Sequence, residues 1–235
     1  MLQPDPLGPR RIAEELTALF ASLRYVFSVQ TFGSLARDDW DRWSDIDLLL
    51  VTASRAQFRA AFDHLCEQKS VVYHAPFAPR VEPSGGRVLG ITFEGESVFH
   101  SLDLNFLTAG EARTIKAWER FTPNKTVYTA AHTVTQMPGE KEPEPDPEEN
   151  LVERRITTAQ HFTKVHAKRI LRNKHPDRYE LQRWSDDLRT ALQAPGVEDL
   201  GEGVRRLGRS YLEIAEAVLA DDNKDNLIKL DLLNN

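Results

Sequence analysis

Two aspartates that stand one residue apart, Asp45 and Asp47, head an apolar run in this sequence. Side chains of an extended strand alternate between its faces, so both carboxylates project on one side while Ile46 and Leu48 point into the core. Carboxylates this close repel each other unless a cation lies between them, and hard oxygen ligands of this kind suit Mg²⁺. The pattern predicts a metal site at one strand end, and with it metal-assisted phosphoryl or nucleotidyl transfer.

A Gly-Ser turn precedes these aspartates. Residues 28–32 are predicted to form a short strand, after which Gly33 allows a close backbone approach. Ser34 is suited to cap a short helix over 35–40, and the first-turn amides of such a helix can bind a phosphate. The simpler alternative is a surface turn followed by two solvated aspartates, and Asp-x-Asp by itself does not exclude it.

The combined pattern is more restrictive than its parts. The stretch resembles the signature of the DNA polymerase β-like nucleotidyltransferase superfamily. It consists of Gly33-Ser34, a ten-residue spacer and Asp45-Ile46-Asp47, followed by a run of aliphatic residues. The resemblance covers roughly residues 12–107 and is greatest to the bacterial small-molecule adenylyltransferases of the aminoglycoside type. It implies a second phosphate ligand at Ser44, which stands directly before the first aspartate, and a third carboxylate on a later strand.

The rest of the N-terminal part of the chain is predicted to be a mixture of helices and strands that position this turn. Apolar spacing predicts helices over 10–25 and 55–68, and strands over 45–51, 71–74, 87–93 and 97–107. A hairpin turn is expected at 94–96, between the last two strands.

Asp103 is the predicted third carboxylate. It shares one face of its strand with Asn105, while the neighbouring apolar residues occupy the other face. A carboxylate there could complete the metal site or take the proton from an attacking hydroxyl. The competing candidates Glu82, Glu94 and Glu96 stand in loop or turn sequence, where solvated carboxylates are expected. His100 is expected to be structural.

A proline- and acid-rich segment over 137–150 divides the chain and is predicted to be an extended linker. We therefore expect a nucleotidyltransferase domain over 1–136 and a helical domain over 151–235. Helical periodicity covers 151–173, 176–192, 197–219 and 226–233. The predicted fold class is α+β: an N-terminal nucleotidyltransferase fold, with a mixed sheet and helices, followed by a C-terminal antiparallel helical bundle.

The first helix of that bundle is basic in a protein whose formal net charge is −6. Some of its cations could face a triphosphate, and Lys164 and Lys168 are the favoured positions, with Tyr211 on a later helix as a weaker one. The alternative is an ordinary solvated helix face, which is the commoner explanation of such charges.

The amino-acid composition indicates which partners and which cellular location to expect. The acidic balance disfavours a polymerase-like grip on nucleic acid, which needs a basic stripe. The single cysteine, Cys66, excludes an internal disulfide framework and fits a reducing, cytoplasmic location. Neither a signal peptide nor a membrane-spanning run is recognisable, so no membrane partner is expected.

These observations predict a Mg²⁺-dependent nucleotidyltransferase. The resemblance implies that two ions are held by Asp45, Asp47 and Asp103, that ATP or another NTP lies along Gly33 and Ser34, and that a nucleoside monophosphate passes to a small hydroxylated acceptor. An aminoglycoside-like antibiotic suits the acidic balance. The alternatives are an antitoxin-type enzyme that adds AMP to a protein, and a noncatalytic regulatory protein of the same fold. Whether two copies associate to complete the cleft is left open.

Overall fold

The computed structural model divides the chain into two compact units. One, here called the sheet unit, comprises Pro6–Thr92 and His100–Pro147; the other, here called the helical unit, comprises Met1–Asp5, Phe93–Phe99 and Glu148–Asn235. The structure describes residues 5–79, 85–114, 118–119, 121–131, 143–147, 150–172 and 178–220.

The sheet unit is built from a mixed six-stranded sheet in the order β3-β4-β5-β2-β1-β6. Strands β2 and β5 run parallel, whereas β1 pairs antiparallel with both β2 and β6, and β4 pairs antiparallel with β5. Along the chain its elements are α1 (Gly8–Ala21), β1 (Val26–Phe32), α2 (Gly33–Arg37), β2 (Ile46–Thr52), α3 (Arg55–Gln68), β3 (Val71–Tyr73), β4 (Gly86–Phe93), β5 (Leu102–Thr108), η1 (Glu111–Arg113) and β6 (Asn124–Thr129). The fold class expected from the sequence is confirmed.

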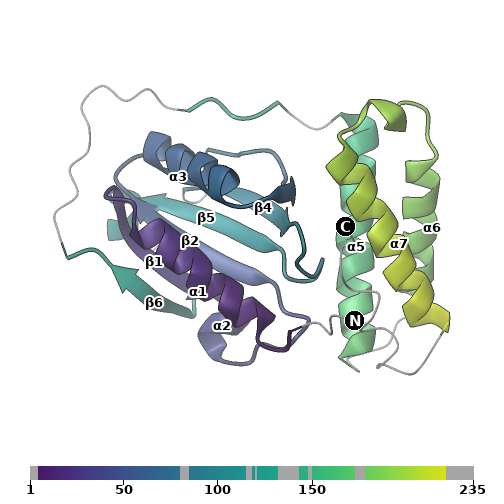
Figure 1. Ribbon diagram of the computed structural model, residues 1–235, viewed down its shortest axis with the longest axis horizontal. Coiled ribbons are helices and arrows are strands. Elements are labelled where there is room, and N and C mark those ends of the chain that lie inside the picture. Colours follow the sequence, from purple (N-terminus) through teal and green to yellow (C-terminus); the bar gives the residue numbers. More distant parts are fainter. Residues whose placement is uncertain are drawn as a thin grey trace. The chain divides into compact units, whose positions relative to one another are not determined.

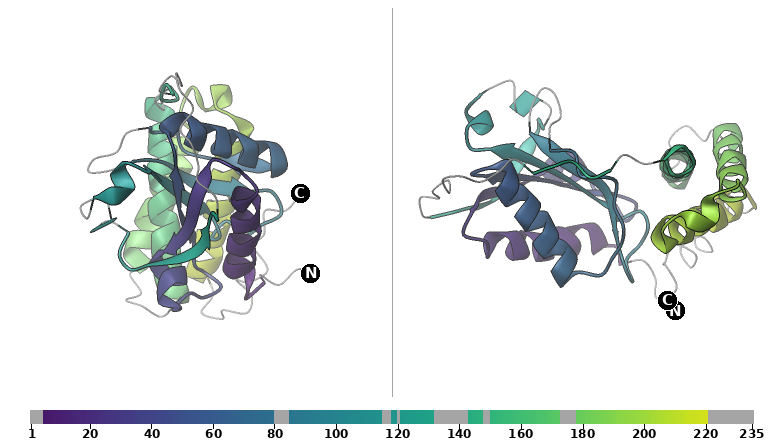
Figure 2. Two further views of the ribbon diagram at one scale, coloured as in Figure 1. Left: turned by 90° about the vertical axis from the view of Figure 1, so that its left-hand side faces the viewer. Right: turned by 90° about the horizontal axis from the view of Figure 1, so that it is seen from above.

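Helices α1 and α3 cover one face of this sheet (Figures 1 and 2). The apolar stripe of α1 buries Leu16 and Phe20, and that of α3 buries Phe58 and Phe62. On the opposite face Leu49 of β2 packs in a cluster with Leu107 and Phe121. The helices therefore leave the second face of the central strands to shorter segments, and this is the face on which the alternation of β2 places Asp47.

The strand predicted over 97–107 is too long. Strand β5 begins only at Leu102, and residues 94–101 form a loop instead of a tight hairpin turn. Val98 and Phe99 of this loop are buried within the helical unit, where the carbonyl of Val98 accepts a hydrogen bond from Tyr211. Their apolar character, which looked like a continuation of the strand, is used for packing against helices.

The helical unit contains α5 (Leu151–Leu171), α6 (Arg178–Leu192), η2 (Val197–Asp199) and α7 (Glu202–Ala220). The three α-helices contact one another in every pair, as expected for the predicted bundle. Asn150 caps α5 by accepting a hydrogen bond from the amide of Glu153 at 2.9 Å. The helix predicted over 226–233 lies outside the described residues. None of the helices in the described ranges is long and apolar enough to cross a bilayer.

The proline- and acid-rich segment is anchored at one point. Asp146 accepts hydrogen bonds from Arg59 at 2.6 Å and from the amide of Phe77 at 3.0 Å. Burial opposes ionisation of Asp146, but the bonds from Arg59 and Phe77 outweigh it and lower the pKa of its carboxyl. The segment is therefore tied to the sheet unit at Asp146, where the sequence predicts only an extended linker.

Candidate active site

Two of the predicted carboxylates stand level on neighbouring strands. Asp47 of β2 and Asp103 of β5 are Cα partners in the parallel ladder, and both are half-buried between fully buried residues. Partners in a ladder place their side chains on the same face of the sheet. The predicted pairing of these two positions, which lie far apart in sequence, is thus set by the β2–β5 register.

Gly33 lies directly against Asp47. Its φ is +63°, and a Cβ atom built on it would stand 2.2 Å from Asp47 Oδ2. Only glycine meets both conditions, because other residues rarely adopt this φ and would clash with the carboxylate. The close backbone approach predicted for this turn is therefore made toward an aspartate of the site.

Ser34 follows inside the first turn of α2. The prediction that it caps this helix is wrong, because α2 begins at Gly33 and Phe32 occupies the cap position without a side-chain hydrogen bond. The Ser34 hydroxyl oxygen is buried and has no hydrogen-bond partner among the residues that the structure describes. A buried hydroxyl without a partner is costly, so Ser34 is a group that a bound phosphate oxygen could satisfy.

Ser44 occupies a structural position in the loop before β2. Its hydroxyl accepts a hydrogen bond from the amide of Asp41 at 2.9 Å and donates one to the Asp41 carboxylate at 3.2 Å, and the side chain is 1% exposed. His100 supports the same loop by donating to the carbonyl of Arg42 at 2.8 Å. This geometry favours a role for Ser44 in holding Asp45 at the strand end, whereas the sequence suggests a phosphate ligand.

Asp103 is oriented by a residue that sequence reasoning missed. Its Oδ1 accepts a hydrogen bond from the amide of Gly90 at 2.8 Å. The register of β4 with β5 shifts between Val88 and Ile91, and Gly90 has a φ of +63° there. An isolated glycine inside a predicted strand is a signal for such a bulge, and the segment over 87–93 contains one.

The same bond directs the Asp103 carboxylate toward β4, while Asp47 lies on the other neighbouring strand, β2. Among the described residues no group of three or more His, Cys, Asp or Glu side chains is arranged to hold a metal ion. Asp45 and Asp47 still provide the paired oxygen donors that Mg²⁺ accepts from proteins, with substrate phosphates as further ligands.

The two predicted lysines belong to the helical unit. Lys168 is 7% exposed, and its Nζ lies 6.0 Å from the centroid of the Phe99 ring, within the range of a cation–π contact. Lys164, one turn earlier on α5, is half-buried. The structure places Lys168 in a packing contact within the helical unit.

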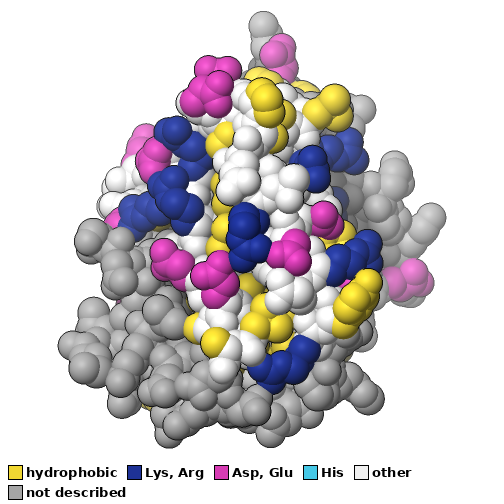
Figure 3. Space-filling model, turned by 90° about the vertical axis from the view of Figure 1, so that its right-hand side faces the viewer, with side chains coloured by type: hydrophobic (Ala, Val, Ile, Leu, Met, Phe, Trp, Pro, Cys, Tyr) yellow, Lys and Arg dark blue, Asp and Glu magenta, His cyan; other side chains and the backbone are white. Residues whose placement is uncertain are grey.

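The exposed charges of the helical unit are mixed in sign. Figure 3 shows Lys and Arg side chains interspersed with Asp and Glu over the helices that face the viewer. Arg189 pairs with Asp186 at 2.6 Å, and Glu202 pairs with both Arg205 and Arg209. The described residues on this face form no continuous basic stripe of the kind that nucleic-acid binding needs.

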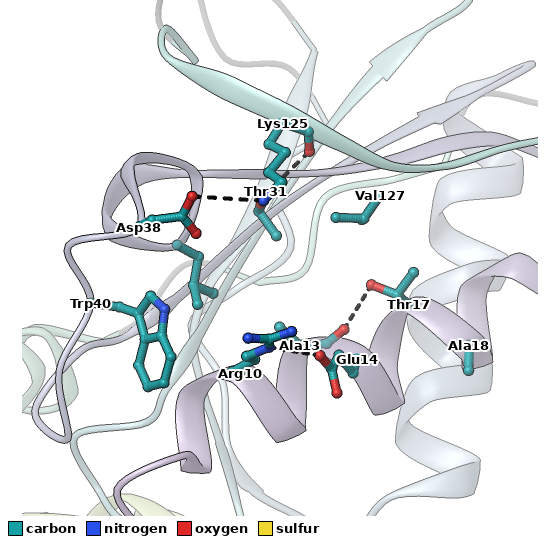
Figure 4. A pocket seen from close by; sticks show the side chains of 11 residues that line it. Arg10, Ala13, Glu14, Thr17, Ala18, Thr31, Asp38, Trp40, Lys125 and Val127 are labelled. Atoms are coloured by element: carbon teal, nitrogen blue, oxygen red, sulfur yellow. Dashed lines mark hydrogen bonds and ion pairs between the residues drawn. The ribbon is translucent and has the colours of Figure 1, made fainter.

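A pocket of about 380 Å³ lies between α1, the end of α2 and β6 (Figure 4). Arg10 and Glu14 pair along one side of it, and Asp38 and Lys125 along another. Thr31 lines the pocket and is the ladder partner of Leu48, so the pocket opens on the sheet face opposite to that of Asp47. It is therefore separate from the carboxylate site.

A comparison with protein families matches the stretch that contains the first part of this site. A family model described as a nucleotidyltransferase domain matches residues 10–83, a stretch that includes the Gly33-Ser34 turn and the aspartates of β2. No curated protein matches the chain. The matched domain indicates transfer of a nucleoside monophosphate in general, and it ends before Asp103, so the role of that residue rests on its register with Asp47.

Proposed function

We propose that this protein is a Mg²⁺-dependent nucleotidyltransferase that transfers a nucleoside monophosphate, AMP from ATP in the first instance, to a hydroxyl group of a small molecule. The observation that carries the proposal is the assembly of Gly33, Asp47 and Asp103. A glycine with positive φ lies against one aspartate, and the β2–β5 register sets the second aspartate beside it.

Asp45 and Asp47 would hold the metal, which when bound neutralises charge on the phosphates and on the departing pyrophosphate. Gly33 lets the backbone of the turn lie directly against the Asp47 carboxylate, because a Cβ there would stand 2.2 Å from Asp47 Oδ2. Ser34 donates its otherwise unpartnered hydroxyl to a phosphate oxygen. These three features support a triphosphate site at the start of α2.

Asp103 acts as the general base in this proposal. Its Oδ1 is bonded to the Gly90 amide on the side of β4, and this fixed orientation supports a role in proton transfer. The acceptor hydroxyl attacks the α-phosphorus, so that a new O–P bond forms while the bond from that phosphorus to the β-phosphate oxygen breaks. The hydroxyl proton passes to Asp103, and pyrophosphate leaves.

The acceptor class rests on charge. With 36 acidic against 30 basic residues, the chain attracts cationic molecules more readily than anionic ones, which supports an amine-bearing acceptor such as an aminoglycoside-like antibiotic. Lys164 remains a candidate contact to the triphosphate from α5. The acidic balance argues against RNA as the acceptor, and a protein acceptor is the main alternative within the same reaction class.

Release of pyrophosphate from ATP tests the proposal. The full-length protein is incubated with MgCl₂, ATP and, in separate arms, an aminoglycoside, a polyol, a protein lysate fraction and an RNA. We expect acceptor-dependent release in the small-molecule arms and its loss on chelation of the metal. Asp47→Asn should lower the rate by roughly 1000-fold or more, since it removes a group that positions transition-state charge.

Asp146→Asn is the matched control, because it makes the same chemical change at an aspartate that holds the connecting segment. It should retain near-normal turnover. Activity that survives Asp47→Asn would sink the site assignment. Labelling confined to the protein arm would replace the small-molecule acceptor by a polypeptide, and failure of every arm with folded protein would favour the noncatalytic alternative.

A further inference from the structure

The loop between β4 and β5 is held by three side chains of the helical unit. Arg206 of α7 donates two parallel hydrogen bonds to the carboxylate of Glu94, at 2.6 and 2.8 Å. A bidentate arginine–carboxylate pair fixes orientation as well as distance, because both groups are planar. Each of the two side chains is about 30% exposed, so solvent screens this ion pair less than it screens the more exposed Arg209–Glu202 pair of the same helix.

The second contact is buried. The hydroxyl of Tyr211, five residues further along α7, donates to the carbonyl of Val98 at 2.9 Å, and the tyrosine is 4% exposed. Lys168 of α5 supplies the third contact through its ammonium above the ring of Phe99, which is 1% exposed. Because these contacts hold both halves of the loop, its conformation is determined by α5 and α7.

This loop connects directly to the residues that orient the proposed base. Glu94 follows Gly90 by four residues, and Phe99 precedes Asp103 by four. Gly90 and Asp103 are joined by the 2.8 Å hydrogen bond between the glycine amide and the carboxylate. The two strands that carry this bond are therefore joined by the loop over 94–99, whose conformation the three contacts hold.

We propose that Arg206, Tyr211 and Lys168 form a clamp on the loop over 94–99 that keeps Asp103 bonded to Gly90 and thereby positions it for proton transfer. The helical unit then contributes to catalysis through the geometry of this loop. The catalytic part of this inference rests on the proposed function, whereas the mechanical part, from clamp to Gly90, does not.

Hydrogen exchange of the Gly90 amide, measured by NMR on the full chain, tests the mechanical part. Arg206→Gln should speed exchange at Gly90 and across the loop by roughly tenfold, because opening of the clamp exposes that amide more often. Arg209→Gln is the matched control: Arg209 lies one turn further along α7, is 56% exposed and pairs with Glu202. It should leave Gly90 unchanged.

A charge-exchange variant distinguishes loss of the Arg206–Glu94 pair from general destabilisation of the helical bundle. The double variant Glu94→Arg with Arg206→Glu should return Gly90 exchange to within about threefold of the natural protein, since the salt bridge is rebuilt in reverse. Unaltered Gly90 exchange in Arg206→Gln, with an unaltered unfolding midpoint, would overturn the clamp. Equal acceleration of all amides in Arg206→Gln and Arg209→Gln would also overturn it.

Kinetics test the catalytic part. Arg206→Gln should lower kcat roughly tenfold with little change in the KM for ATP, because the base is displaced while the nucleotide turn is untouched. A change confined to KM would contradict a positioning role and favour direct nucleotide contact. If no acceptor supports turnover, the proposed function fails, and the exchange of Gly90 still decides for or against the clamp.

Discussion

The two units of this protein use charged residues in different ways. In the sheet unit Asp47 and Asp103 are half-buried, stand on adjacent strands and are set level by the ladder. In the helical unit the acidic residues of the exposed faces, such as Asp186 and Glu202, pair with arginines three or seven residues away along one helix. One arrangement concentrates negative charge, and the other neutralises it locally.

This difference explains why a functional interpretation suits one set of charges and a structural one the other. Carboxylates placed side by side on a sheet lose favourable hydration and repel each other, so their arrangement favours a bound cation. Exposed helical pairs cost little to form and stabilise little. The arginines of α7 are thus explained by pairing, since Arg205 and Arg209 bond to Glu202 and Arg206 bonds to Glu94.

Gly33→Ala should have the largest effect on activity among the substitutions that compare the sheet unit with the helical unit. The new Cβ would stand 2.2 Å from Asp47 Oδ2, so that the carboxylate must move. We expect kcat for pyrophosphate release to fall by roughly 100-fold, the size expected when a reacting group is misplaced by an ångström.

Gly196 provides the control in the helical unit. Its φ is +87° and nothing lies within 4 Å of a Cβ built on it. Gly196→Ala should destabilise the protein by roughly 1 kcal/mol, the cost of a left-handed conformation for an L-residue, while turnover stays unchanged. Equal turnover in the two variants would mean that the Gly33–Asp47 contact has no catalytic importance.

Asp146→Asn should have an intermediate effect, which we expect on the free energy of unfolding. Its partners Arg59 and the Phe77 amide bind the charged carboxylate, so neutralisation should lower the free energy of unfolding at pH 7 by about 1–2 kcal/mol. The folded-state pKa of Asp146 is lowered, so its contribution is complete above the unfolded value near 3.9 and is lost as pH falls through the folded value.

Urea unfolding of both proteins from pH 7 to pH 3 measures this difference. The gap between natural protein and Asp146→Asn should narrow only below about pH 4. A gap that is constant over this range would show that the charge of Asp146 is not what anchors the segment, and that its packing against Phe77 is.

Arg189→Ala should have the smallest effect. Arg189 is 40% exposed and bonds to Asp186 and Glu216 on the surface of the helical unit. We expect the free energy of unfolding to change by no more than about 0.5 kcal/mol, and turnover to stay the same. A loss above about 1 kcal/mol in urea unfolding would mean that the surface pairs act as a cooperative network, which would weaken the contrast between the units.

Much of the sheet unit could be predicted from the sequence because its signals are local. Strand β2 and helix α3 follow from alternation and apolar spacing, and the prediction of a helix over 55–68 agrees with α3 (Arg55–Gln68) at both ends. The Ser97–Ser101 stretch was misassigned as strand, because burial by a distant helix produces the same apolar pattern as burial in a sheet. Anchoring of the acidic segment was missed for a similar reason: Asp146 finds Arg59 only in the folded chain.

The sequence by itself determined the Gly-Ser turn, the paired aspartates of β2 and the class of chemistry that they suggest, since these depend on residues close together in the chain. Only the tertiary structure decided that Asp103 stands level with Asp47, that Gly90 directs its carboxylate toward β4, and that Lys168 contacts an aromatic ring. Those features arise from strand register and helix packing, which join residues far apart in sequence. Residues 31–51 therefore suggest the class of reaction, and the fold determines which other residues lie beside them.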